Sequence, residues 1–283
     1  MKNSYSQHLI DVANVSDTGR KRPHNEDSTV SDTKLGLAIV TDGMGGYKAG
    51  EVASAIAAQL MLIRIRESLD SADQPHDGDQ LDIDRRHLPS SALREAIKAA
   101  NSAVFRTAQD EPECNGMGTT VAALWHWEGQ IFIAHVGDSR VYRFRDDRLE
   151  QLTKDHSLVQ ELIDRGFYTS EEAAQNTPKN LVTRALGIEA NVEVDLQQRP
   201  ASDKDLYLLC SDGLTDMVND EEIGLTLGKY SANLGDAAGE LVRLANEKGG
   251  KDNVSVILVR PLPPSAGTEK MLARVRNWVK KRS

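Results

Sequence analysis

Short apolar runs, several of which lead straight into acidic turns, recur along this chain of 283 residues and leave few architectures open to it. Runs of this length that are rich in β-branched residues predict β-strands. They cover residues 9–15, 35–40, 119–125, 131–136, 141–144, 206–210 and 254–259. Apolar residues spaced three and four apart predict helices over residues 50–69, 91–108 and 236–247, the last with Asp236 as its N-cap. This mixture predicts an α+β fold in which helices cover sheets in layers.

The charge balance and the hydropathy exclude several classes of protein. Acidic residues outnumber basic ones by 43 to 34, although the last 23 positions hold six basic residues and one acidic residue. Because so acidic a body repels polyanions, we expect no nucleic-acid partner. No apolar stretch of about 18 residues occurs and residues 1–10 are polar, so we expect no stable membrane insertion and a cytoplasmic location. Two cysteines are too few for a disulfide framework.

Three segments stand apart from the predicted core. Residues 68–90 hold six aspartates and few apolar residues, which predicts a solvated loop between helices. Residues 261–268 hold three prolines and read as a linker. Residues 269–283 predict a basic amphipathic C-terminal helix that packs on the domain or contacts a partner. Capping-box spacing from Ser157 and from Thr169 predicts two short helices after residue 156.

Acidic residues cluster where the predicted strands end or begin. They are Glu26, Asp27, Asp42, Asp138, Asp212 and Asp252. An aspartate and a glycine after a strand are a common turn signal, so any one of these positions taken alone is more readily a turn than a ligand. Five such turns favour a second interpretation, because strand ends converge in a packed sheet and converging carboxylates repel one another unless a cation lies between them.

The ligand types indicate which metal such a site would take. Carboxylate, carbonyl and water oxygens suit Mg²⁺ or Mn²⁺ rather than zinc. The chain has no Gly-x-x-x-x-Gly-Lys-Ser/Thr loop, no Gly-x-Ser-x-Gly elbow and no His-Glu-x-x-His pair. Cys210 is followed six residues later by Asp216 rather than by an arginine, which excludes the cysteine-phosphatase arrangement. What remains is a hydrolase that uses metal-activated water, without an indication of the reaction.

Taken in order, the motifs resemble those of the metal-dependent protein serine/threonine phosphatases of type 2C, the PPM family, over about residues 10–260. They are Arg22-x-x-Asn25-Glu26-Asp27, Asp42-Gly43-Met44-Gly45-Gly46, Gly118-Thr119-Thr120, Val136-Gly137-Asp138-Ser139-Arg140, Asp155-His156-Ser157, Thr183-Arg184-Ala185-Leu186-Gly187, Leu209-Cys210-Ser211-Asp212-Gly213-Leu214 and Asp252-Asn253. The resemblance implies a phosphatase domain over residues 1–260, with residues 156–180 as a flap insertion. It implies a four-layer α-β-β-α sandwich whose two antiparallel sheets surround a dinuclear metal site.

The resemblance also implies metal ligands. Asp42 would bridge two Mn²⁺ or Mg²⁺ ions, and the Gly43 carbonyl would bind the second ion, with Glu26 and Asp27 near it. The first ion would be held by Asp212 and Asp252.

Two further positions have roles that the resemblance implies and for which the residues leave an alternative. Asp138 would share a third, weaker ion with Asp212, or else only cap its turn, which Arg140 would support. Arg22 would clamp the substrate phosphate, or else form an ordinary surface salt bridge. Together with Asp42, Arg22 is the predicted catalytic residue.

The leaving alkoxide of such a reaction needs a proton. Animal members of the family carry a histidine at the position of Met44, whereas bacterial members carry methionine there, as this chain does. The thioether of methionine cannot donate a proton. Water on the metal is the favoured acid, with His24 and His156 as the other candidates.

The implied function is hydrolysis of phosphoserine and phosphothreonine in proteins, opposing a Ser/Thr kinase in bacterial signalling. We expect the chain to act as a monomer on phosphoproteins. A catalytically silent phosphoprotein-binding module and a small-molecule phosphomonoesterase are the alternatives.

Overall fold

Two antiparallel β-sheets form the centre of the protein, as seen in a computed structural model that describes residues 9–46, 48–72, 80–169, 172 and 181–262. The first sheet has the order β1 (Ile10–Asp17), β11 (Val254–Pro261), β10 (Leu206–Cys210), β7 (Arg140–Arg145) and β8 (Arg148–Gln151). The second has the order β2 (Asp27–Asp32), β3 (Leu37–Met44), β5 (Val121–Trp127), β6 (Gln130–Val136) and β9 (Asp195–Pro200), with the short β4 (Gly118–Thr119) paired to β3.

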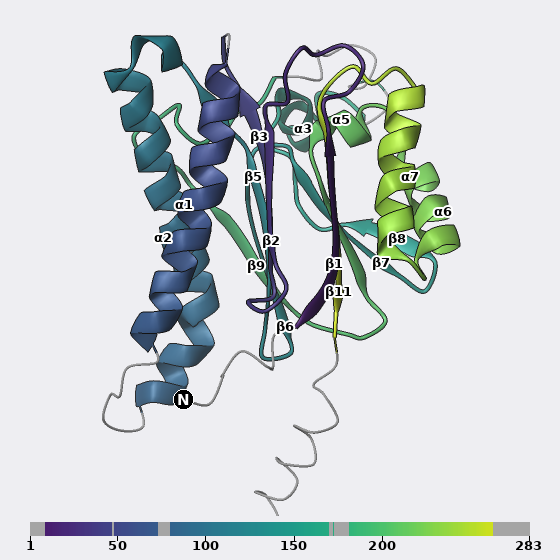
Figure 1. Cartoon of the computed structure of the whole chain (residues 1–283), viewed down its shortest axis with the longest axis horizontal. Coiled ribbons are helices and arrows are strands. Elements are labelled where there is room, and N and C mark those ends of the chain that lie inside the picture. The colour runs from purple at the N-terminus through teal and green to yellow at the C-terminus, as the bar shows by residue number, and fades with distance from the viewer. Residues whose placement is uncertain (1–8, 47, 73–79, 170–171, 173–180, 263–283) are drawn as a thin grey trace, which may run out of the picture.

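Helices cover the outer face of each sheet. The long α1 (Ala49–Ala72) and α2 (Gln80–Asp110) lie on the second sheet, and α6 (Asp220–Tyr230) and α7 (Leu234–Glu247) lie on the first (Figure 1). One apolar core fills the space between each sheet and its helices, and a third fills the space between the sheets. The predicted four-layer α-β-β-α sandwich is therefore confirmed.

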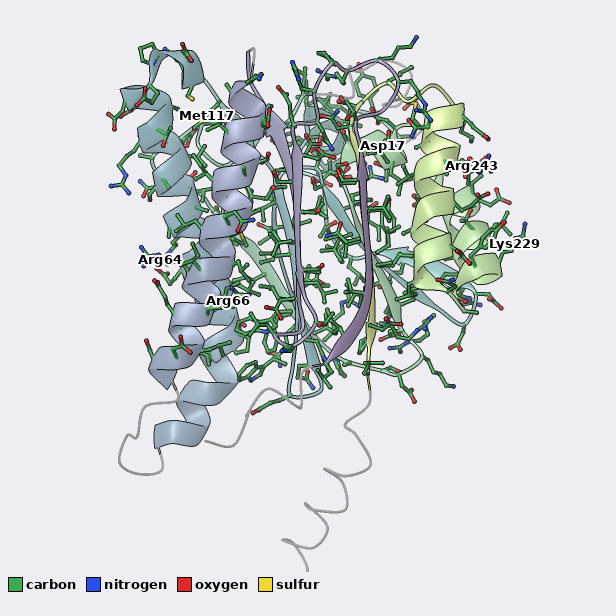
Figure 2. The ribbon with its side chains drawn as sticks, viewed as in Figure 1. Asp17, Arg64, Arg66, Met117, Lys229 and Arg243 are labelled. Atoms are coloured by element: carbon green, nitrogen blue, oxygen red, sulfur yellow. The ribbon has the colours of Figure 1, made fainter. Side chains whose placement is uncertain are left out.

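The central strands are apolar throughout because both of their faces are buried. Side chains alternate between the two faces of a strand. Along β10, Leu208 and Cys210 pack beneath α6 and α7, whereas Tyr207 and Leu209 pack between the sheets. Charged side chains such as Arg64, Arg66, Lys229 and Arg243 belong to the covering helices and are set along the outside of the molecule (Figure 2). A strand covered on both sides reads as a continuous apolar run, which is why these strands were visible in the sequence.

The structure differs from the sequence-based expectation in several elements. The polar strands β2, β8 and β9 and the helix α6 were not predicted. The segment 68–90, predicted as a loop, is largely helical, because α1 continues to Ala72 and α2 begins at Gln80. Leu69 is buried at the end of α1 and Leu88 packs against the same core, so apolar contacts extend both helices into the polar segment. Helix α7 begins one turn earlier than expected, with Asn233 rather than Asp236 as its N-cap.

The segment after β8 begins as predicted. Helix α3 (Leu158–Asp164) follows Ser157, whose hydroxyl accepts a hydrogen bond from the Gln160 backbone N–H. Thr169 and Glu172 exchange the two hydrogen bonds of a capping box. Residues 173–180, and with them most of the second predicted helix, lie outside the described residues.

Two further expectations concern the C-terminal end and membrane contact. Strand β11 extends through Pro261, the first residue of the expected linker. The rest of that linker from residue 263 and the expected C-terminal helix lie outside the described residues. None of the helices in the described ranges combines the length and the apolar character needed to cross a bilayer.

Candidate active site

The acidic strand ends meet at one end of the sandwich, near α3 and the short helix α5 (Asp212–Thr215) (Figure 1). Asp42 lies in β3, Asp138 lies between β6 and β7, Asp212 follows β10 by two residues, and Asp252 lies two residues before β11. These four carboxylates line one cavity of about 180 Å³. The remaining lining residues are Arg22, Glu26, Gly43, Met44, Gly45, Thr120 and Val182. The tertiary structure thus brings seven separate parts of the chain to one cavity.

The backbone around Asp42 is fixed by two threonines. The Thr120 N–H and the Thr119 hydroxyl donate to the Asp42 carbonyl at 2.8 and 2.9 Å. The Asp42 N–H donates to the Thr120 hydroxyl at 3.0 Å. Since both backbone groups of Asp42 are bonded in this way, its carboxylate is the group presented to the cavity.

Gly43 allows the backbone to approach closely at the cavity wall. Its N–H donates to the Glu26 carbonyl at 3.1 Å. A Cβ atom at this position would lie 2.0 Å from the Gly50 carbonyl oxygen, which excludes every side chain. Glycine is therefore required here by packing, whatever its carbonyl binds.

Asp27 lies beside Asp42 in the sheet but does not line the cavity. The two residues are paired in the register of β2 and β3. Asp27 is 8% exposed, and the Ser211 hydroxyl donates to its Oδ2 at 2.7 Å. Its Oδ1 is buried and has no hydrogen-bond partner among the described residues. A buried carboxylate oxygen without a partner is costly, which indicates that a cation or water completes the site.

The carboxylates raise one another's pKa values. Burial raises the pKa of Asp42 and of Asp212 well above the usual range, and the neighbouring carboxylates raise both further. Burial raises the pKa of Asp27 to about 6 and that of Asp138 to about 6. These shifts have one physical meaning: several negative charges share a poorly solvated space and need positive charge beside them.

Arg22 is the basic residue at this cavity. Its Nη2 atom lies 2.7 Å from Asp252 Oδ2, and its side chain is 50% exposed. The hydrogen bond to Asp252 raises the pKa of Arg22. The ion pair that was the alternative to a phosphate clamp is therefore present. However, both of its residues line the cavity, and half of the Arg22 side chain remains exposed.

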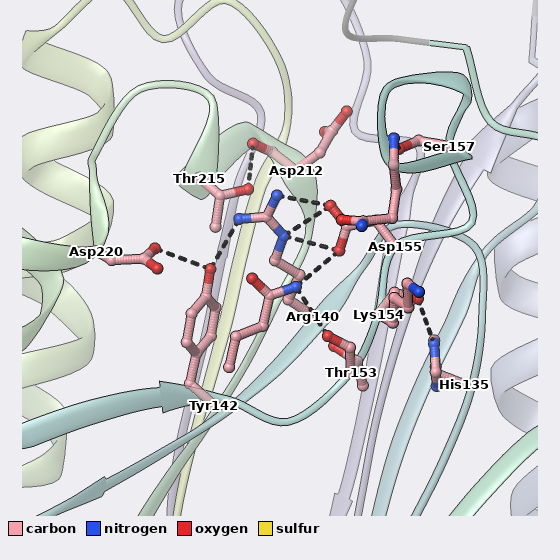
Figure 3. A network of polar contacts seen from close by, with 12 residues as sticks. His135, Arg140, Tyr142, Thr153, Lys154, Asp155, Ser157, Asp212, Thr215 and Asp220 are labelled. Atoms are coloured by element: carbon pink, nitrogen blue, oxygen red, sulfur yellow. Dashed lines mark hydrogen bonds and ion pairs between the residues drawn. The ribbon is translucent and has the colours of Figure 1, made fainter. Parts of the chain in front are cut away.

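Asp138 also lines a second cavity of about 180 Å³, which it shares with Asp212. Its other lining residues are Arg140, Asp155, Ser157, Val159, Thr215 and Asp216. Figure 3 shows Arg140 held by Asp155 through Nε and Nη2 and by the Tyr142 hydroxyl through Nη1, at 2.6–2.9 Å. These contacts fix the side chain of Arg140, two residues after Asp138, and that Arg140 supports the Asp138 turn stays a prediction.

Neither histidine considered as a general acid lines either cavity. The Nδ1 atom of His156 accepts the Gly137 N–H at 3.0 Å, and its ring stacks on His135 with 4.7 Å between the centroids. Burial lowers the pKa of His156 to about 4, with smaller contributions from nearby cationic groups. His156 is therefore a neutral structural side chain, and Met44 occupies the cavity position without a proton to give.

One group of possible metal ligands lies outside these cavities. His135, His156 and Asp195 bring ligand atoms within 4.8 Å of one another. However, His135 Nε2 bonds to the Lys154 carbonyl at 2.8 Å. Arg184 Nη1 lies 2.8 Å from Asp195 Oδ1 and 3.1 Å from His156 Nε2. A guanidinium already supplies the positive charge at this group, which makes it a poor place for a metal ion.

The main cavity, by contrast, fits Mn²⁺ or Mg²⁺. Its ionisable lining consists of five carboxylates and one arginine. Its donors are oxygen atoms, which these hard cations prefer. The unpartnered Oδ1 of Asp27 and the upward pKa shifts both indicate missing positive charge.

Sequence reasoning missed the neutral residues that hold the charged ones. Thr120, Ser211 and Asn253 carry no charge and were noted only as motif members. Each makes side-chain hydrogen bonds to backbone or carboxylate groups of the site. Each of them directly adjoins an apolar strand, which was the available signal, but only the structure shows which partner each one has.

Comparison with known proteins places this site in a family. The sequence profile of the family described as protein phosphatase 2C matches residues 20–249. The chain is 40% identical to the serine/threonine phosphatase Stp of Listeria innocua over 248 residues, which is 86% of this chain and 92% of that one. It is 42% identical to the serine/threonine protein phosphatase PstP of Mycobacterium tuberculosis over 251 residues, which is 88% of this chain and 45% of that one.

Solved structures agree with the sequence comparison. The catalytic domain of PstP in complex with two manganese ions superposes with a TM-score of 0.73 at 39% identity, covering 89% of this chain and 98% of that one. The serine/threonine phosphatase Stp1 from Staphylococcus aureus gives a TM-score of 0.77 at 34% identity, covering 90% and 96%. The chain belongs to the protein phosphatase 2C family and is a manganese- or magnesium-dependent protein serine/threonine phosphatase.

Proposed function

We propose that the main cavity is where this phosphatase hydrolyses phosphoserine and phosphothreonine, and that acidic residues in and beside the cavity hold the metal ions. Asp42 is assigned to both ions of a pair, and the Gly43 carbonyl and Asp27 to the second ion. The first ion is assigned to Asp212 and Asp252. The observation that carries the assignment is the convergence of carboxylates from separate strand ends on one cavity that also contains an arginine.

The proposal gives Asp138 and Glu26 supporting places. Asp138 lines both cavities and shares them with Asp212, which suits a third, weaker ion between these two residues. Glu26 lines the main cavity, and burial raises its pKa. It is assigned to the surroundings of the second ion.

Arg22 is the group that binds the substrate phosphate in this proposal. One Nη atom is fixed by Asp252, so the guanidinium has a set orientation while half of the side chain stays exposed to solvent. A planar guanidinium binds two phosphate oxygens at once, which lysine cannot do. Arg22 would draw the phosphorylated side chain to the cavity and balance its charge.

The chemistry itself depends on the ions. Ions held here would supply an activated water as the nucleophile and positive charge to offset that of the phosphate oxygens. The carboxylates would hold the ions at fixed positions, and Arg22 would hold the phosphate group in position for attack. Met44 leaves the wall of the cavity without a side-chain acid, so the proton for the departing serine or threonine alkoxide is assigned to solvent.

The biological setting remains a proposal. We infer that the substrates are phosphoproteins made by a Ser/Thr kinase, that the enzyme works as a monomer in the cytoplasm, and that residues 156–180 border substrate access. Val182 and Val159, which flank that segment or belong to it, line the two cavities. No observation favours a silent binding module or a small-molecule phosphomonoesterase.

Asp42→Asn tests the metal assignment. Hydrolysis of a phosphothreonine peptide with saturating Mn²⁺ should fall at least about a thousandfold, because the substitution removes a charge from both ions. Wild-type protein with EDTA should show the same loss. Asp32→Asn is the matched control, since Asp32 bonds to Arg66 away from the cavity, and it should keep wild-type turnover. Activity of Asp42→Asn close to wild type would contradict the assignment.

A further inference from the structure

Asn253 lies at the junction of two parts of the active site that are far apart in sequence. It follows Asp252 directly and is 5% exposed. Its side-chain Nδ2 donates to the Thr18 carbonyl at 2.9 Å and to the His24 carbonyl at 2.8 Å. Its Oδ1 accepts the Glu26 N–H at 2.8 Å. Both N–H groups and the carbonyl of the amide are thus bonded.

All three partners belong to one loop. Residues 18–26 join β1 to β2 outside both sheets, and they carry Arg22. Within this loop, the Arg20 N–H also donates to the Gly250 carbonyl at 2.7 Å. The Arg22 side chain forms an ion pair with Asp252. Because this loop lies outside the sheets, the hydrogen bonds of the Asn253 amide hold its backbone in place of bonds to a neighbouring strand.

The backbone of Asn253 fixes the other partner of this ion pair. Its N–H donates to Asp252 Oδ1 at 2.9 Å, while Asp252 Oδ2 accepts from Arg22. One residue thus orients Asp252 through its backbone and the Arg22 loop through its side chain. Loss of the side-chain bonds would loosen the loop without removing Asp252, although the bond between Arg20 and Gly250 would remain.

We propose that Asn253 is a positioning residue that holds the 18–26 loop so that Arg22 meets the phosphoryl group of the substrate. The inference rests on the phosphate-binding role assigned to Arg22 above. It assigns to Asn253 no contact with substrate or metal. The predicted effect of its loss is therefore weaker phosphate binding rather than loss of the ions.

Asn253→Asp tests the proposal with a side chain of nearly the same size. The aspartate loses both N–H donors and turns a negative oxygen toward two carbonyls. At saturating Mn²⁺, the inhibition constant for inorganic phosphate and KM for a phosphothreonine peptide should each rise about tenfold. The reason is that the displaced Arg22 guanidinium no longer makes its charged hydrogen bond to the phosphate. The Arg22→Ala variant should show a similar rise. The double variant should be no weaker than Arg22→Ala alone, because both changes remove one interaction.

Asn101→Asp is the matched control. Asn101 is 1% exposed, and its amide makes the same three kinds of hydrogen bond, to the Glu189 and Ala190 carbonyls and from the Gly187 N–H. It should lower the melting temperature while the phosphate inhibition constant stays at the wild-type value. If Asn253→Asp does not fold, Asn253→Ala assayed at reduced temperature takes its place.

The outcomes separate this inference from the proposed function. If Arg22→Ala leaves phosphate inhibition unchanged, the role of Arg22 fails and the inference fails with it. If Arg22→Ala weakens inhibition but Asn253→Asp and Asn253→Ala do not, only the inference is overturned. Fold-changes that multiply in the double variant would likewise overturn it, since Asn253 would then act independently of Arg22.

Discussion

Ser211, Thr120 and His156 hold no metal in the proposed site, yet each fixes a residue that does through short hydrogen bonds. Ser211 bonds to Asp27, and Thr120 bonds to the backbone of Asp42. His156 accepts the N–H of Gly137 immediately before Asp138, and the His156 N–H donates to the Gly137 carbonyl at 3.0 Å. At this scale, the neutral residues set where the charges lie.

Substitutions of His156 test whether its hydrogen bond to Gly137 positions Asp138. His156→Asn places an oxygen near the original Nδ1 and should still accept the Gly137 N–H, whereas His156→Gln places its amide near Nε2 and should not. Leaving a buried N–H without an acceptor costs about 1–3 kcal/mol. Manganese-dependent turnover should therefore fall about tenfold or more in His156→Gln and much less in His156→Asn. The measurement is kcat together with the Mn²⁺ concentration for half-maximal activity.

The same pair of variants examines the acid role considered for His156. A general acid would be lost equally in both, because neither amide titrates. Equal losses, accompanied by a changed pH–rate profile, would contradict the structural role.

At the scale of elements, end effects decide what the sequence pattern alone cannot. Helix α7 begins after Asn233, whose side chain accepts the N–H groups of Gly235 and Asp236. Asp236, one turn further on, has spacing that suits a cap equally well, and its Oδ2 instead accepts from Asn233 Nδ2. Helix α6 similarly begins with a capping box between Asn219 and Glu222.

Substitution of the two α7 residues distinguishes these readings. Asn233→Ala should lower the free energy of unfolding by about 1 kcal/mol, because it leaves two backbone N–H groups without an acceptor. Asp236→Ala should cost less, since it removes one exposed contact and a favourable charge near the helix N-terminus. Urea unfolding of the metal-loaded enzyme measures both. A larger loss of unfolding free energy for Asp236→Ala than for Asn233→Ala would indicate that Asp236, not Asn233, is the N-cap.

At the scale of the whole molecule, the sandwich holds its acidic site together against repulsion. Folding raises the pKa values of Asp27 and Asp138 to about 6, so the folded chain binds protons more tightly than the unfolded chain. For such groups, stability is fully present below the unfolded pKa and is lost as pH rises through the folded pKa. The metal-free protein should thus lose stability between about pH 4 and pH 6.

Metal addition should reverse that loss. Mn²⁺ supplies the missing charge but competes with protons, so it should raise Tm more at pH 7.5 than at pH 5. Thermal unfolding with EDTA and with Mn²⁺ at the two pH values gives the comparison. An equal rise in Tm at both values would show that the acidic cluster is not where Mn²⁺ binds.

The sequence by itself determined the central strands, the α+β class and the positions of the acidic turns. Strands such as β10 and β11 are buried on both faces, so their burial is written into continuous apolar runs. The polar strand β2 carries no such signal, because its pairing with β3 rather than its own composition makes it a strand.

Only the tertiary structure decided which of these residues meet. Asp27 and Asp42 are neighbours through the β2–β3 register, and Arg22 reaches Asp252 across 230 positions of sequence. The same structure excluded His24 and His156 from the cavity lining and gave Asn253 its partners. Local sequence fixes the conformation that each segment prefers, whereas contacts between distant segments depend on how the sheets and loops pack.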